Sequence, residues 1–320
     1  MTQTTHSVSH AMQSLKRCYR YPAASDFAKI ILLGCLLFCG VLSSPSQGRA
    51  QGHDKIEVFT SLAPVAFVVA QIGGEQIRSR TLLPPGRDPH TYSPTPRQMA
   101  VLSKAHIYFT VGMPFERELL PRLSGRRNDL QVVDCSSGLA KRALNHDDHS
   151  HHHDQETDPH IWLGIQPLAG MAENIAATLS RRRPEQSQLF ADNLAGFLAR
   201  LRQVEQELKH TLAPFQGRGF LVFHPSFGYF ADSFGLVQHA VEIEGKSPSP
   251  RQLTRIIKLA RAEGIKVIFV QPQFDRRAAS RIAQAIGGRI VTLDPLAADP
   301  FANFREMATK IAAALTPAEK

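Results

Sequence analysis

The chain has 320 residues, of which 43% are hydrophobic and 20% are charged, a composition typical of a globular protein large enough for two domains. Its formal net charge is +9, but residues 1–50 contain five Lys or Arg and one acid, so residues 51–320 carry 9 − 4 = +5. The basic residues form no run interleaved with aromatic residues, which argues against nucleic-acid binding. We therefore expect no nucleic-acid partner. We also expect the protein to be a monomer.

An apolar run at 30–42 (IILLGCLLFCGVL) follows basic residues and precedes the small-residue segment SSPSQGRA. This order is typical of a secretory signal, and the run is shorter than the ~20 residues that span a bilayer as a helix. We expect residues 1–50 to be a signal peptide cleaved before Gln51. A lipid anchor at Cys35 is the less favoured alternative, because the apolar run continues past that cysteine.

Three of the four cysteines, Cys18, Cys35 and Cys39, lie in this leader, so the exported chain keeps Cys135 alone. It cannot form an internal disulfide, and it has no cysteine pair to hold zinc through sulfur. Any metal site must therefore use nitrogen and oxygen ligands.

Strand and helix patterns alternate in the first part of the exported chain. Strands are predicted at 56–60, 77–83, 105–111 and 131–135, and helices at 64–72, 95–103 and 114–123. Such alternation produces βαβ units and a mainly parallel sheet.

A polar segment at 145–162 (NHDDHSHHHDQETDPHIW) holds six histidines and five acidic residues. Neutral imidazole is the commonest protein ligand for borderline metals, although a histidine-rich tract indicates metal binding by composition alone. The alternative is a solvated polar loop. We expect residues 145–154 to be an auxiliary metal loop. Its candidate ligands are His146, His149, His151, His152 and His153.

Two helices are predicted next, at 168–182 and 185–212. The second has apolar residues at three- and four-residue intervals and no internal proline. At ~1.5 Å per residue it would be roughly 42 Å long. We expect it to join two lobes as a rigid strut; the alternative is one more packed helix of a single core.

The alternation of strands and helices then begins again. Strands are predicted at 219–223, 266–270 and 289–293, a partly extended segment at 235–243, and helices at 249–263, 276–286 and 301–315. The predicted fold class is α/β, with two lobes of mainly parallel sheet joined by a long rigid helix and a metal site in the cleft between them. The expected parts are an N-terminal lobe at 51–165, a helical segment at 166–213 and a C-terminal lobe at 214–320.

Three candidate metal donors come after predicted strands: His90 after 77–83, His224 after 219–223 and Asp294 after 289–293. In open α/β sheets, ligands bind beyond the carboxyl ends of the strands. His160 lies where the histidine-rich segment returns to regular structure, and like His90 it belongs to an Asp-Pro-His tripeptide. Three imidazoles and one carboxylate make a suitable four-coordinate shell for Zn²⁺.

Each donor also has a structural interpretation. The Asp-Pro-His tripeptides of His90 and His160 are compatible with simple turns, His224 with a buried polar contact, and Asp294 with capping of the loop that follows it.

Four motifs resemble those of the metal-binding proteins of ABC transporters, in particular the periplasmic zinc-binding component of high-affinity zinc uptake systems. They are GRDPHTYSPTP (86–96), DPHIWL (158–163), HPSFGYFA (224–231) and LDPLA (293–297). The resemblance covers residues 54–315. Pro225 departs from the aspartate of many relatives, but no donor is lost.

The resemblance implies two α/β lobes bridged by a rigid helix, with the metal held between them by His90, His160, His224 and Asp294. It also implies a periplasmic carrier that captures Zn²⁺ and delivers it to an ABC transporter permease. A histidine- and acid-rich loop before the second histidine is typical of the zinc-specific members.

Alternatives to a zinc carrier remain at this point. A manganese or nickel carrier, or a metal-binding adhesin, would use the same fold. Manganese prefers oxygen-rich shells, whereas three imidazoles suit Zn²⁺, Cu²⁺ and Ni²⁺. A zinc hydrolase is less favoured, because the sequence has no HExxH helix. We therefore expect no enzymatic activity.

Overall fold

The computed structural model describes residues 54–124, 129–143, 157–242, 248–274 and 276–317. The expected signal peptide and the histidine-rich loop at 145–154 lie outside the described residues. Asp54–Lys320 form one compact unit. Within the described ranges, no helix combines the length and apolar character needed to cross a membrane.

The first sheet has four parallel strands in the order β2-β1-β3-β4. Its strands are β1 (Ile56–Thr60), β2 (Ile77–Thr81), β3 (Ile107–Thr110) and β4 (Gln131–Asp134). The helices between them are α2 (Ala63–Gly73), α3 (Pro96–Leu102) and α4 (Pro114–Ser124). Every residue of the central strand β3, IYFT, is buried, as expected for a parallel strand covered on both faces.

The second sheet repeats this topology, with four parallel strands in the order β6-β5-β7-β8. Its strands are β5 (Gly219–Val222), β6 (Val237–Ala240), β7 (Val267–Val270) and β8 (Arg289–Thr292). Its helices are α7 (Gly228–Phe234), α8 (Pro250–Ala262), α9 (Arg276–Ala285) and α10 (Pro300–Leu315). In both sheets the second strand in sequence lies at one edge, next to the first strand. The third and fourth strands lie, in that order, on the other side of the first strand. The predicted α/β fold with two parallel sheets is confirmed.

Two long helices separate the sheets in sequence, α5 (Ile165–Arg182) and the 26-residue α6 (Ser187–Leu212). Short 3₁₀ turns, Pro184–Gln186 and Ala213–Phe215, flank α6, so the α-helix itself begins two residues later than predicted. Pro184 fits the first position of this turn because its missing N–H would have no helical partner there.

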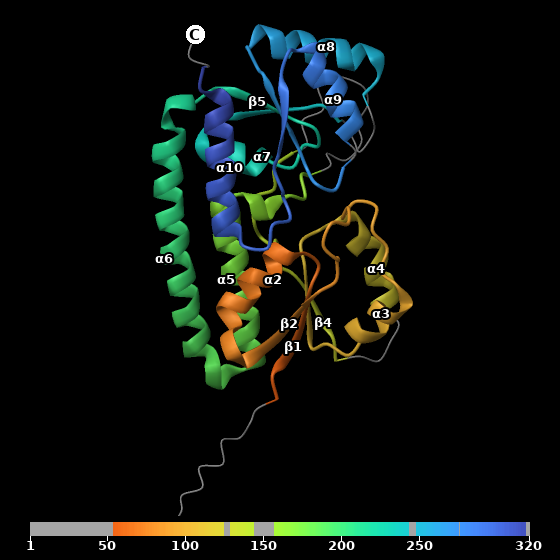
Figure 1. Ribbon diagram of the computed structural model, residues 1–320. Helices are drawn as coiled ribbons and strands as arrows, with labels where there is room; N and C mark the ends of the chain where they lie inside the picture. Colours follow the sequence, from red (N-terminus) through yellow and green to blue (C-terminus); the bar gives the residue numbers. More distant parts are fainter. Residues whose placement is uncertain (1–53, 125–128, 144–156, 243–247, 275, 318–320) are drawn as a thin grey trace, which may run out of the picture. The chain divides into compact units, whose positions relative to one another are not determined.

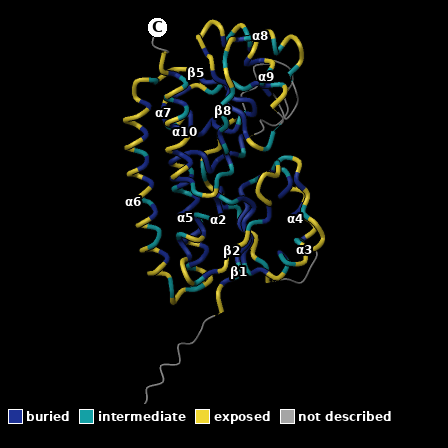
Figure 2. The backbone as a smooth tube through the Cα atoms, viewed as in Figure 1, coloured by how far each residue is buried: buried dark blue, intermediate teal, exposed yellow. Residues whose placement is uncertain are grey.

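α6 contacts α2 and α5 from the first half of the unit and α10 from the second (Figure 1). Its buried side chains recur at intervals of three, four and seven residues, and its other side is exposed (Figure 2). They are Phe190, Phe197, Leu201, Val204, Leu208 and Leu212. One helix therefore packs against elements that belong with both sheets, as the strut hypothesis predicts.

One hydrophobic core includes residues of both sheets, among them Val58 of β1 and Phe220 of β5. A smaller core joins β7 to α8 and α9 and contains Ile268 and Ile282. α8 and α9 therefore cover a face of the second sheet with an apolar layer of their own.

Candidate metal centre

Three imidazoles from distant parts of the sequence lie together. The ligand nitrogens of His90, His160 and His224 are all within 4.8 Å of one another. The Nε2 atoms of His90 and His160 are 3.3 Å apart, and the ring centroids of His90 and His224 are 4.6 Å apart. His160 and His224 are buried and His90 is partly buried. The structure thus brings together three of the four predicted donors.

The two Asp-Pro-His tripeptides form the same local turn. The backbone N–H of His90 donates to Asp88 Oδ1 at 2.9 Å, and that of His160 donates to Asp158 Oδ1 at 3.0 Å. In each case the aspartate accepts a bond from the residue two positions later, as in an Asx turn. The turn interpretation and the donor interpretation are therefore compatible, since the turn fixes the backbone that carries the imidazole.

His160 has a carboxylate behind its ring. Its Nδ1 lies 2.7 Å from Asp158 Oδ1, and the Asp158 side chain is fully buried. An ionised carboxylate only accepts hydrogen bonds, so Nδ1 carries the proton and Nε2, which faces His90 Nε2, has the lone pair that could bind a cation. Carboxylate partners of this kind fix the tautomer and raise the basicity of metal-binding histidines.

Four contacts fix His224 just beyond the end of β5. Its Nδ1 lies 2.8 Å from Glu242 Oε2, and its ring stacks on Phe274 at a centroid distance of 4.8 Å. Gln271 accepts from the His224 N–H at 3.3 Å and donates to the His224 carbonyl at 2.6 Å. His224 Nε2 is buried and has no hydrogen-bond partner. A buried nitrogen without a partner is costly unless a ligand binds it.

Burial favours the neutral form of two of the imidazoles. Burial, followed by repulsion from His160 and His224, lowers the pKa of His90 to about 2. Burial also lowers the pKa of His224, against the opposing effect of the hydrogen bond that its ring makes to Glu242. Metal ions bind the neutral form of imidazole, so His90 and His224 are in the state that a metal requires.

Asp294, the fourth predicted donor, lies outside the three-imidazole group. Its Oδ1 accepts hydrogen bonds from Gln273 Nε2 and from the backbone N–H of Leu296, both at 3.0 Å. The segment is nevertheless tied to the histidines, because Trp162, two residues after His160, donates from Nε1 to the Pro295 carbonyl at 2.7 Å.

The sequence interpretation missed the residues behind the histidines. Glu242 lies two residues after β6, and Gln271 directly follows β7. The strand-end rule that identified His224 would also have found Gln271, which follows the strand predicted at 266–270. It would not have found Glu242, which lies inside the segment predicted as partly extended, 235–243.

Cys135 and His106 have structural surroundings. Cys135 is fully buried, its Sγ donates to the Thr110 carbonyl at 3.0 Å, and burial raises its thiol pKa well above the usual value. His106 Nδ1 accepts from the Glu57 N–H at 3.0 Å. The thiol is protonated and enclosed, so Cys135 is inert.

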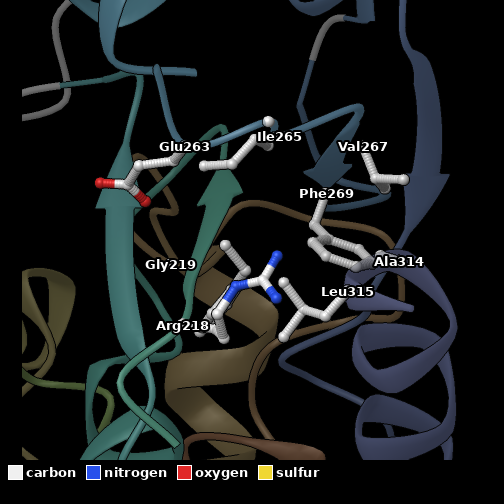
Figure 3. A pocket seen from close by; sticks show the side chains of 10 residues that line it. Arg218, Gly219, Glu263, Ile265, Val267, Phe269, Ala314 and Leu315 are labelled. Atoms are coloured by element: carbon white, nitrogen blue, oxygen red, sulfur yellow. The ribbon is translucent and has the colours of Figure 1, made fainter. Parts of the chain in front are cut away.

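A separate hollow lies beside the second sheet and shares no lining residue with the imidazole cluster (Figure 3). Arg218, Phe269 and Leu315 are among its lining residues, and its water-accessible volume is about 10 Å³. That space holds roughly one water molecule, which is too little for an organic solute.

Residues 58–318 match the family described as "Zinc-uptake complex component A periplasmic". The chain belongs to this family. The match includes strands of both sheets and all three clustered histidines. The predicted resemblance to periplasmic zinc-binding components is confirmed.

Similar proteins support this assignment. A crystal structure of ZnuA superposes with a TM-score of 0.77 and is 36% identical, covering 82% of this chain and all of that one. A zinc-bound ZnuA deletion mutant, 35% identical, also has a TM-score of 0.77 and covers 83% of this chain and 100% of its own. The high-affinity zinc uptake system protein ZnuA of Yersinia pestis is 28% identical over 77% of this chain and 87% of its own length.

Proposed function

We propose that this periplasmic protein captures Zn²⁺ at the cluster of His90, His160 and His224 and delivers it to the permease of an ABC transporter. The observation that carries the proposal is the convergence of three imidazoles, two of them backed by buried carboxylates, with His224 Nε2 buried and unpartnered. Family membership supports the same conclusion.

The ligand chemistry favours zinc over manganese. The three clustered donors are all nitrogens, whereas Mn²⁺ prefers carboxylate and other oxygen ligands. Ni²⁺ would bind such nitrogens too, so a nickel carrier is the alternative that a competition experiment must test.

Asp294 is proposed as the fourth donor. It lies just beyond β8, and the contact between Trp162 and Pro295 keeps its segment beside His160. Gln273 donates to its Oδ1, so this carboxylate is hydrogen-bonded before a cation binds. With Asp294 the shell would be the N₃O set that suits tetrahedral zinc.

The histidine-rich loop is proposed to gather zinc weakly and to pass it to the tight site, through His146, His149, His151, His152 and His153. Deleting residues 145–154 should leave one tight site and remove the weaker ones, as counted by titration with zinc. Loss of the tight site on this deletion would contradict the proposal.

We propose transport of the ion and not catalysis with it. Among the described residues, the two carboxylates that bond the imidazole rings, Asp158 and Glu242, each accept from an Nδ1. They orient ligands and are not free to act as a general base for a zinc-bound water.

The test is competition of Zn²⁺, Ni²⁺ and Mn²⁺ for the purified metal-free chain in the presence of a calibrated chelator. We expect one tight zinc site, which is lost in His160→Ala and kept in His239→Ala, a matched change of a histidine that pairs with Glu263 outside the cluster. Equal zinc binding by both variants, or tighter binding of Mn²⁺ than of Zn²⁺, would overturn the proposal.

A further inference from the structure

Arg142 lies where two stretches of the chain, 142–143 and 157–158, run side by side. The Asp158 N–H donates to the Arg142 carbonyl at 2.8 Å, and Ala143 and Thr157 form an isolated antiparallel bridge. These contacts stand immediately before and at the start of the tripeptide that carries His160.

The Tyr229 hydroxyl of α7 hydrogen-bonds both Arg142 and Asp158 and so connects them to the second half of the unit. Tyr229 Oη accepts from the Arg142 N–H at 2.8 Å and donates to the Asp158 carbonyl at 3.0 Å. Arg142 Nε bonds Asp232 Oδ2, also on α7, at 2.9 Å. The guanidinium lies against Gly228, where an added Cβ would be 2.6 Å from Nη1. Glycine at this position therefore allows the close approach of the guanidinium.

The same guanidinium faces the carboxylate behind His160. Asp158 Oδ1 bonds the His160 backbone and ring, whereas Oδ2 is buried and has no hydrogen-bond partner. Arg142 Nη1 lies 3.9 Å from this Oδ2, and the two side chains are 22% and 0% exposed. A buried carboxylate is costly without a nearby positive charge. The Arg142 guanidinium provides that charge.

We propose that Arg142 is a positioning residue for the metal site. It keeps the carboxylate of Asp158 in place behind His160 and, through Tyr229 and Asp232, holds this arrangement against α7. The inference rests on the proposed zinc binding. It adds a residue that touches neither the cation nor an imidazole but sets the zinc affinity through Asp158.

The test is a double-mutant cycle on zinc affinity, measured by chelator competition with the purified full chain. Removal of partners behind a metal-binding histidine typically weakens binding about 10- to 100-fold. Arg142→Met, which keeps bulk and removes charge, should weaken zinc binding about tenfold, and Arg142→Lys should recover part of the loss. In an Asp158→Asn background the same Arg142→Met change should have little further effect, because the charge that it compensates is gone.

Two controls separate positioning from general stability. Arg305→Met removes an arginine–carboxylate pair between α10 and α6, Arg305 with Glu207, and should leave zinc affinity unchanged. In an Asp232→Asn background, Arg142→Met should still weaken binding, because the contact with Asp158 remains to be lost.

Unchanged zinc affinity in Arg142→Met, or equal losses with and without the Asp158 carboxylate, would overturn the inference. A lowered melting temperature with normal affinity would also overturn it, since Arg142 would then serve the fold alone. Failure of the wild-type chain to bind zinc would instead overturn the proposed function, so the two failures are distinguishable.

Discussion

Each of the two buried histidines, His160 and His224, has an acidic partner. The two partners lie at different distances along the sequence. Asp158 is two residues from His160, whereas Glu242 is eighteen residues from His224. Both carboxylates are buried with the rings that they contact. The orientation of these two rings therefore depends on buried carboxylates that bond their Nδ1 atoms.

Replacing Glu242 with glutamine tests this dependence. Loss of the charge behind His224 should weaken zinc binding about 10- to 100-fold, because the ring loses the partner that fixes its tautomer and raises its basicity. Chelator competition at constant pH measures the change.

The matched control is Glu263→Gln, which alters the partner of His239, a histidine outside the cluster whose Nε2 lies 3.1 Å from Glu263 Oε2. Zinc affinity should be unchanged in this variant. Equal effects of the two substitutions would mean that Glu242 acts through general stability or net charge.

Acidification should destabilise the metal-free chain through His90. The pKa of His90 is about 2 in the folded chain and about 6.5 in the unfolded chain. Below pH 6.5 the unfolded chain therefore binds a proton at His90 that the folded chain does not bind. Stability from this residue is present above pH 6.5 and is lost as the pH falls toward 2. Between pH 7 and pH 5.5 the loss should be about 1 kcal/mol.

Urea denaturation at the two pH values, compared between the wild type and His90→Asn, measures this contribution, because the variant lacks the titrating imidazole. The variant should lose less stability on acidification. An identical pH dependence would show that His90 titrates normally in the folded chain.

At the scale of elements, α6 and α10 meet through aromatic contacts. The Phe301 ring lies 5.0 Å from that of Phe197, and the Arg200 guanidinium lies 4.6 Å from the Phe301 centroid. Phe67 of α2 meets the same ring edge-on at 5.7 Å. Phe301 is thus the point at which helices from both halves of the unit meet.

Phe301→Ala should lower the free energy of unfolding by about 3–5 kcal/mol, because it removes a buried ring and leaves a cavity. Leu189→Ala, at a 40% exposed position of α6, should change it by less than about 0.5 kcal/mol. Urea denaturation measures both. A small effect of Phe301→Ala would show that other contacts, and not those of the Phe301 ring, hold α6 against α10.

The helices and strands could be predicted because their patterns are local. The start of α8 follows from a capping box in which Ser249 and Gln252 satisfy each other's backbone N–H groups, and Pro250 occupies the first helical position. The strand order could not be predicted, because it depends on contacts between residues far apart in sequence.

At the scale of the site, the motifs predicted His90, His160 and His224, since each stands beside a turn or strand end that the sequence reveals. The contact between Arg142 and Asp232 joins residues ninety positions apart, and no local pattern in the sequence connects them. The position of Asp294 outside the imidazole group likewise depends on the packing of Gln273 and Trp162.

At the scale of the whole unit, two sheets of the same strand order each place a histidine beyond a strand, His90 after β2 and His224 after β5. His160 comes from the segment that leads into α5. Because the three histidines belong to separate segments, a cation bound by all of them would cross-link parts of the fold that α6 also connects.

The most direct test is a crystal structure of the zinc-loaded chain with anomalous data collected at the zinc edge. We predict a peak about 2.0–2.1 Å from a ring nitrogen of each of His90, His160 and His224, with an oxygen of Asp294 completing the shell. A zinc peak elsewhere, with these three imidazoles left without metal, would contradict the account.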